Sequence, residues 1–193
     1  MLSVFDDVFA AMAQNGIVWM VCWTVTVTLI VAAIIDGYKL KVPNWLTFPM
    51  IAGGWLASGL VFGWAGLGWS LVGTAVGLAL LLPAYAIGGM GAGDVKLLAG
   101  VGAWVGPGLT LRAFVASAVV GGVIALVMVL ARRKWGHHKN QFLMILSEIL
   151  ILRNPDELSK IAADRKSSMM LLPYGIPIAI GSIGYFAFVG LLL

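Results

Sequence analysis

Long stretches with few or no charged side chains constrain this chain more than any other feature of its sequence. Six apolar runs follow one another, and they cover residues 16–35, 45–64, 67–87, 95–107, 109–131 and 171–193. A helix needs about 20 such residues to cross the hydrocarbon core of a bilayer. Of the 193 residues, 61% are hydrophobic and only 10% are charged, which excludes an ordinary water-soluble domain. The sequence therefore predicts an all-α, polytopic membrane bundle of about six transmembrane helices.

The blocks of apolar residues favour helices over an outer-membrane barrel, whose strands are short and alternate in polarity. The run at 95–107 is short, because a helix of that length covers only about 20 Å of a core roughly 30 Å thick. We expect this run to cross the membrane as a short span packed through its glycines. A re-entrant segment would instead place the most basic loop outside, against the positive-inside rule.

The basic residues predict how the bundle is oriented. Of the 12 Lys and Arg residues, eight lie within 132–166, two follow the first run and one follows the third. With six spans and the N-terminus outside, all of these face the cytoplasm. The topology gives one membrane-embedded domain over 1–193, with a helical cytoplasmic loop at about 132–170, and it puts Asp36 and Asp94 at the same membrane face. It also accounts for the net charge of +4 without a nucleic-acid partner.

Two of the eight acidic residues stand out because each lies at the end of an apolar run. Asp36 ends the first run, and Asp94 follows the glycine-rich stretch Gly88–Gly93 after the third. A charge at membrane depth costs on the order of a few kcal/mol, so an acid there marks a candidate functional site. Two carboxylates that meet in a low-dielectric site tend to share one proton, and one can then activate a water while its protonated partner polarises a carbonyl group. The pattern indicates aspartic-protease chemistry, which needs no metal or other cofactor.

A simpler interpretation treats both acids as interfacial charges at helix ends, paired with lysines such as Lys39, Lys41 or Lys96. The glycines favour the functional interpretation, since they let the backbone or a substrate approach Asp94 closely.

A metal site is not expected from the other polar residues. The adjacent His137 and His138 lack the further ligands and spacing that zinc needs, and the single cysteine, Cys22, has no partner. The glycine-rich stretch also lacks the Gly-Lys-Ser/Thr ending of a phosphate-binding loop.

The residues around both aspartates resemble the motifs of one family. The stretch Gly89-Met90-Gly91-Ala92-Gly93-Asp94-Val95-Lys96-Leu97 resembles the Gly-x-Gly-Asp signature of the type IV prepilin peptidases. Asp36 followed by Val42-Pro43-Asn44-Trp45-Leu46-Thr47 resembles their other aspartate motif, and Leu172-Pro173-Tyr174-Gly175-Ile176-Pro177 resembles their C-terminal proline-containing segment. The motifs occur in family order, and the resemblance covers roughly Asp36 to the C-terminus.

The resemblance implies an aspartic endopeptidase of the bacterial inner membrane. Such enzymes remove the short basic leader of a pilin precursor at the cytoplasmic face, just ahead of the pilin's apolar helix. Carried over by motif, Asp36 and Asp94 form the catalytic pair. The other motif residues, which we expect to shape the site or support the substrate, are Gly91, Gly93, Lys96, Pro43 and Asn44.

The sequence differs from the larger members of that family in one respect. Those members carry an N-terminal cytoplasmic region with paired Cys-x-x-Cys motifs, which is associated with N-methylation of the mature pilin. This sequence has one cysteine and no such region, so it resembles the short, peptidase-only members of Flp-type or tight-adherence pilus systems. We do not expect N-methyltransferase activity.

Two other functions stay open at this point. A broader intramembrane protease similar to signal peptide peptidases would also use Gly-x-Gly-Asp, although the Pro-Asn-x-Leu-Thr context at 43–47 and the small size favour a prepilin peptidase. A non-enzymatic proton-relay or transport protein would also carry acids within the membrane. The sequence shows neither the inverted repeats nor the midplane helix breaks that are typical of transporters.

Overall fold

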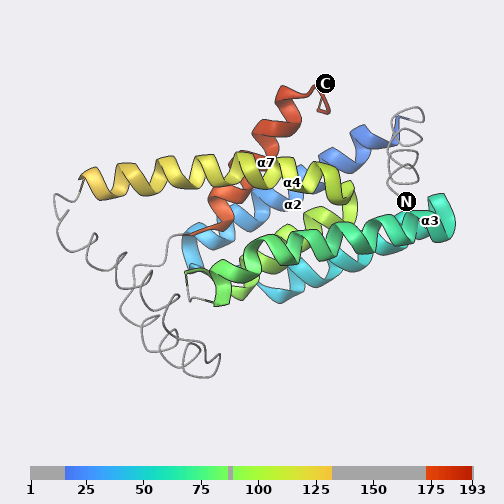
Figure 1. Ribbon diagram of the computed structural model, residues 1–193, viewed down its shortest axis with the longest axis horizontal. Coiled ribbons are helices and arrows are strands. Elements are labelled where there is room, and N and C mark those ends of the chain that lie inside the picture. Colours follow the sequence, from blue (N-terminus) through green and yellow to red (C-terminus); the bar gives the residue numbers. More distant parts are fainter. Residues whose placement is uncertain (1–15, 87–88, 132–172, 193) are drawn as a thin grey trace.

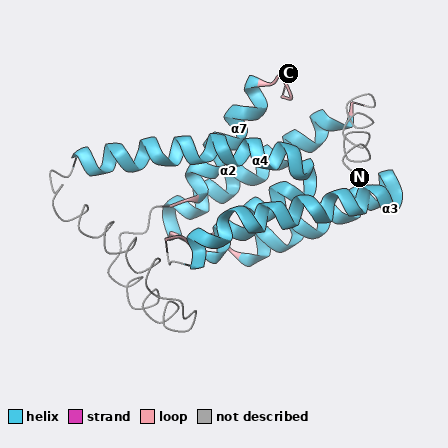
Figure 2. Cartoon of the chain, viewed as in Figure 1, coloured by secondary structure: helices cyan, strands magenta, loops and turns pink. Residues whose placement is uncertain are grey.

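The computed structural model describes residues 16–86, 89–131 and 173–192, and within these ranges it contains helices and short connections but no strand (Figure 2). The helices are α2 (Ile17–Lys39), α3 (Asn44–Ala86), α4 (Ala92–Ala131) and α7 (Gly175–Phe188), labelled as in Figure 1. The all-α prediction is therefore confirmed for the described part of the chain. The predicted loop at about 132–170 and the histidines within it lie outside that part.

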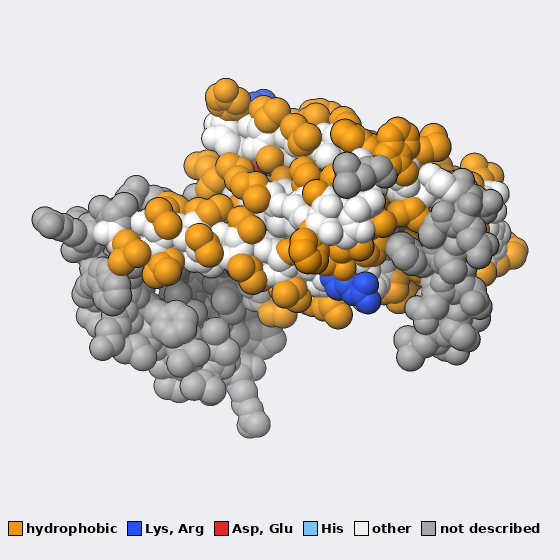
Figure 3. Space-filling view, turned by 90° about the horizontal axis from the view of Figure 1, so that it is seen from above, with side chains coloured by type: hydrophobic (Ala, Val, Ile, Leu, Met, Phe, Trp, Pro, Cys, Tyr) orange, Lys and Arg blue, Asp and Glu red, His pale blue; other side chains and the backbone are white. Residues whose placement is uncertain are grey.

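Three of the helices are long and apolar enough to cross a membrane. These are α2, α3 and the stretch Ala92–Met128 of α4, and α7 is a shorter apolar helix. Large apolar side chains are exposed on the outside of the bundle, for example Trp19, Leu60 and Phe188 (Figure 3). Such an exposed apolar surface suits contact with lipid chains rather than water. The structure thus supports a membrane protein, while six spans and an outside N-terminus remain predictions.

Helix α2 extends one turn further than the sequence predicted. We expected it to end at Ile35, but it continues through Asp36 to Lys39. The chain leaves the helix at Leu40, which takes a left-handed conformation with φ 50° and donates its N–H to the Asp36 carbonyl oxygen at 2.8 Å. A left-handed residue that closes the last turn in this way is a common helix ending. As a result, Asp36 lies inside the last turn of the helix rather than in the connection.

Helix α3 spans 43 residues and would be roughly 65 Å long if it were straight. It folds back on itself at Gly63, whose dihedrals of φ 62° and ψ −148° are not helical. The reversal is evident from the hydrogen bond between Trp55 Nε1 and Thr74 Oγ1, whose length is 2.9 Å. Glycine tolerates these dihedrals because it has no Cβ. The break lies at the end of the second predicted run, 45–64, close to its boundary with the third run, 67–87.

Helix α4 also contains a break, at Gly106, which has φ 72° and ψ 179° and precedes Pro107. Met90, just before the helix, and Gly122, in its second half, line the same pocket. A straight helix would hold these residues roughly 45 Å apart, so α4 folds back as well (Figure 1). Its first arm corresponds to the short run that the sequence predicted at 95–107.

Glycines let the arms of α3 and α4 approach closely. A Cβ added at Gly73 would collide with the carbonyl oxygen of Gly102, and one added at Gly77 would lie 2.5 Å from the carbonyl oxygen of Leu98. Small residues serve helix association in membranes because burial from water cannot drive it there. The first arm of α4 is thus packed through its glycines, as expected, and α7 completes the bundle by packing on α4 and α2.

Candidate active site

Asp36 is a buried carboxylate at the end of α2, with a side chain that is only 2% exposed. Its Oδ2 atom accepts a hydrogen bond of 2.8 Å from the backbone N–H of Gly175, the first residue of α7. The first N–H groups of a helix have no partner within the helix and are suited to binding negative charge. The start of α7 therefore supplies a donor to Asp36 across 139 positions of sequence.

Asp94 is the second buried carboxylate, and it is 6% exposed in the first turn of α4. Its Oδ2 atom accepts a hydrogen bond of 3.2 Å from the backbone N–H of Gly91. An acidic side chain in the first turn is favoured by the helix dipole. The glycine-rich loop and the helix start thus hold Asp94 through residues close to it in sequence.

The start of α7 connects the surroundings of the two aspartates. Gly175 donates to Asp36, and the preceding residue, Tyr174, lines the same pocket as Met90, which lies four positions before Asp94. Consecutive Cα atoms are only about 3.8 Å apart. The surroundings of the two acids therefore meet at one dipeptide, although 58 positions separate the acids in the sequence.

Gly93 brings the α2–α3 connection against the start of α4. A Cβ added at Gly93 would lie 2.6 Å from the carbonyl oxygen of Val42, which is itself only 3% exposed. A Cβ at Gly91 would lie 3.2 Å from Asp94 Oδ2. We expected both glycines to shape the approach to Asp94, and this role stays a prediction. In the structure, Gly93 leaves room for the Val42 backbone and Gly91 leaves room for the Asp94 carboxylate.

The other three motif residues lie near the starts of α3 and α4, and they are Pro43, Asn44 and Lys96. The Lys96 Nζ atom donates to Asn44 Oδ1 at 3.0 Å and lies 4.8 Å from the ring centroid of Phe48. The carbonyl oxygen of Pro43 accepts from the N–H of Leu46 at 3.1 Å as α3 begins. Lys96 thus joins the start of α4 to the start of α3, a contact that sequence reasoning did not identify.

Sequence reasoning assigned no role to Tyr174 and Gly175, which are central to the observed arrangement. The only signal was the proline-containing segment at 172–177, which resembles a family segment but carries no carboxylate, histidine, serine or cysteine side chain. Gly175 contributes through its backbone N–H, and the residue type does not reveal which backbone N–H groups act as donors. No group of three or more potential metal-ligating side chains occurs in the described ranges.

A comparison with known families identifies the wider relationship. The model of the type IV leader peptidase family matches residues 23–126, which include both aspartates and the motif residues around them. This chain belongs to the type IV leader peptidase family. The segment at the start of α7 lies beyond the matched range.

Curated relatives carry the name prepilin leader peptidase/N-methyltransferase. The proteins of Aeromonas salmonicida (strain A449) and Aeromonas hydrophila are each 32% identical to this chain over 123 residues. The alignments cover 60% of this chain but only 41% of each relative, so the chain matches about two fifths of their length. No solved structure matches.

Proposed function

We infer that this chain is an aspartic endopeptidase that cleaves the basic leader from prepilin-like precursors, of which Flp-type precursors are the proposed substrates. The observation that supports this best is that the surroundings of two buried carboxylates meet at Tyr174 and Gly175. Gly175 donates to Asp36, and Tyr174 lines the same pocket as Met90, four positions before Asp94. Membership of the type IV leader peptidase family and the names of the relatives support the reaction. The substrate has a basic leader followed by an apolar helix, and the enzyme lies in the bacterial inner membrane with its site toward the cytoplasm.

In the proposed mechanism, Asp36 and Asp94 share one proton. The ionised carboxylate takes a proton from a water, which attacks the scissile carbonyl carbon, while the protonated carboxylate donates a hydrogen bond to the carbonyl oxygen. The proton then passes to the leaving amine as the peptide bond breaks. Gly175 keeps the Asp36 carboxylate oriented through its N–H, and the Gly91 N–H does the same for Asp94.

We propose peptidase activity without N-methylation. The relatives' name includes both activities, but this sequence has a single cysteine, Cys22, which is buried within α2. The paired Cys-x-x-Cys motifs that the larger members use are therefore not present in this sequence. Mass spectrometry of the cleaved product tests this point, because N-methylation adds one methyl group to the new N-terminus.

The decisive experiment measures cleavage of candidate precursors in membranes that contain wild type, Asp36→Asn or Asp94→Asn at matched expression. We expect wild type to cut at the end of the leader and both variants to fail, because an amide keeps the shape of the carboxylate but cannot exchange the proton. Equal cleavage by all three proteins would overturn the assignment of the pair. Absence of cleavage by wild type, tested against a panel of precursors, would overturn the peptidase function.

A further inference from the structure

A pocket with a volume of about 330 Å³ lies between the end of α3, the second arm of α4 and the start of α7. None of its lining side chains is charged, and only Ser117 and Tyr174 carry a polar group. The Ser117 hydroxyl already contacts the carbonyl oxygens of Ala113 at 2.7 Å and Ile178 at 3.3 Å. A pocket of this size and character is suited to apolar groups. We call it the apolar pocket, and its lining residues are Leu80, Leu81, Ala84, Met90, Phe114, Ser117, Ala118, Gly121, Gly122, Ala125, Tyr174, Pro177 and Ile178.

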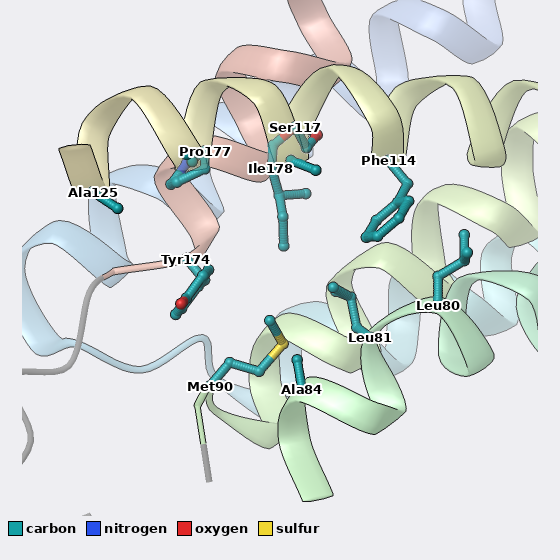
Figure 4. Close-up of a pocket in the computed structure, with 13 residues that line it drawn as sticks. Leu80, Leu81, Ala84, Met90, Phe114, Ser117, Ala125, Tyr174, Pro177 and Ile178 are labelled. Atoms are coloured by element: carbon teal, nitrogen blue, oxygen red, sulfur yellow. Dashed lines mark hydrogen bonds between the residues drawn. The ribbon is translucent and has the colours of Figure 1, made fainter. Parts of the chain in front are cut away.

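The apolar pocket shares a wall with the candidate active site. Tyr174 lines the pocket, and the next residue donates to Asp36. Met90, four positions before Asp94, also lines it. In Figure 4, Met90 and Tyr174 lie on one side of the pocket and Phe114 on the opposite side. The pocket therefore extends away from the two carboxylates toward the second arm of α4.

A peptide bound at the aspartates would bring side chains close to this pocket. An extended chain advances about 3.3–3.6 Å per residue, so residues within a few positions of the scissile bond lie near Tyr174 and Met90. The two sides of that bond differ in charge, because the leader is basic and the segment after it is apolar. A lysine or arginine would lose its hydration in a pocket without an acidic partner, whereas an apolar side chain has no such cost.

We propose that the apolar pocket is the subsite for the apolar side chains that directly follow the scissile bond of the precursor. This inference rests on the proposed peptidase function and extends it to substrate selection. The small residues Ala118, Gly122 and Ala125 recur at spacings of four and three on α4, so they share one helix face and keep that side of the pocket open. They determine how large a side chain the subsite accepts.

Gly122 offers a direct way to fill the pocket. A Cβ added there would meet no atom within 4 Å, so a larger side chain can enter without displacing the protein. Gly184 in α7 is a matched control, because it is also an exposed helical glycine with no atom within 4 Å of an added Cβ, and it does not line the pocket. The experiment compares Gly122→Trp with Gly184→Trp.

The assay uses purified full-length protein in lipid and a precursor that wild type is seen to cleave. We expect Gly122→Trp to raise KM about tenfold or more, with kcat changed by less than about threefold, because a filled subsite weakens substrate binding without touching the carboxylates. Gly184→Trp should behave as wild type. Ala118→Trp, one turn away on the same face, should repeat the effect of Gly122→Trp, and thermal unfolding checks that all three variants are folded.

A compensating change in the precursor separates substrate binding from other effects. Replacing the residue after the scissile bond by alanine should restore most of the cleavage by Gly122→Trp, while improving cleavage by wild type much less. A lipid chain in the pocket, or a purely structural role of Gly122, would not produce this selective rescue. Reduced cleavage without selective rescue would therefore overturn the subsite.

Each remaining outcome also distinguishes the two proposals. If wild type cleaves and Gly122→Trp matches Gly184→Trp in KM, the subsite is overturned and the peptidase function stands. If wild type cleaves none of the precursors, the peptidase function is overturned, and the subsite falls with it.

Discussion

The two aspartates are held in opposite ways. Asp94 receives its hydrogen bond from Gly91, three positions earlier in the same loop, whereas Asp36 receives one from Gly175, 139 positions later. The bond to Asp94 is also longer, at 3.2 Å against 2.8 Å. A local turn can form its contact as soon as it folds, but the contact to Asp36 depends on the packing of α7. The difference predicts that changes at α7 affect Asp36 far more than changes in the loop affect Asp94.

The largest effect should come from the carboxylates themselves, irrespective of how each is held. Asp36→Asn and Asp94→Asn should each reduce kcat by about 10²–10⁴-fold, because a positioned acid or base contributes rate factors of that size. The double variant should be little worse than either single variant, since the two act as one unit. Cleavage kinetics on a single precursor measure all three. A loss confined to one of the two positions would contradict the shared role.

Gly175→Ala should give the next largest effect. Its Cβ would lie 2.8 Å from Asp36 Oδ2 and 3.1 Å from Asp36 Cβ, so the carboxylate must move. We expect kcat to fall about 10- to 100-fold with KM little changed, because a small misplacement of a catalytic group is costly. Gly184→Ala in the same helix serves as the control, and its kinetics should match wild type. A rise in KM without a loss in kcat would show that Gly175 does not act through Asp36.

Gly91→Ala should have a smaller effect than Gly175→Ala. The added Cβ would lie 3.2 Å from Asp94 Oδ2, a contact that a shift of a few tenths of an ångström relieves. Neither glycine has a positive φ, so the comparison measures crowding of the carboxylate rather than backbone strain. We expect kcat to fall less than about tenfold. If Gly91→Ala lowers kcat as much as Gly175→Ala or more, the proposed difference between the surroundings of Asp94 and those of Asp36 is wrong.

Lys96→Met should give the smallest effect. Methionine keeps the unbranched aliphatic part of the lysine side chain, but it removes the hydrogen bond to Asn44 and the charge near Phe48. We expect kcat/KM to fall by about threefold, since partly exposed contacts of this kind are weak.

A double-mutant cycle with Asn44→Ala isolates that contact. If Lys96 acts through Asn44, the double variant should be no worse than the more impaired single variant. Fully additive losses would show that the two side chains act independently.

The contrast between the local hydrogen bond to Asp94 and the distant one to Asp36 explains how much of the site could be predicted from the sequence. The printed hydrogen bond to Asp94 comes from the same glycine-rich stretch, so one motif contains both the acid and the glycine that donates to it. The helix breaks at Gly63 and Gly106 lie close to the predicted ends of the runs 45–64 and 95–107, so they were also indicated locally. The donor to Asp36 could not be predicted, because a backbone N–H has no residue type of its own and its position depends on tertiary packing.

The end of α2 and the orientation of the bundle could not be established from a single segment of the sequence. The sequence does not predict the last turn of α2, because a charged aspartate ends the apolar run, whereas the chain leaves the helix only at Leu40. The orientation of the bundle remains a prediction, because it depends chiefly on basic residues within 132–166 that lie outside the described ranges. The identity of the catalytic pair likewise remains a proposal until the aspartate variants are assayed.

The bond between Gly175 and Asp36 also has a consequence for biosynthesis. A ribosome makes both aspartates before it makes the amide that orients Asp36. The proposed active site is therefore incomplete while the first three described helices enter the membrane, and it is finished when α7 docks. A nascent chain that has not yet reached α7 would carry both acidic residues yet lack the contact that orients one of them, so proteolytic competence would follow the docking of α7.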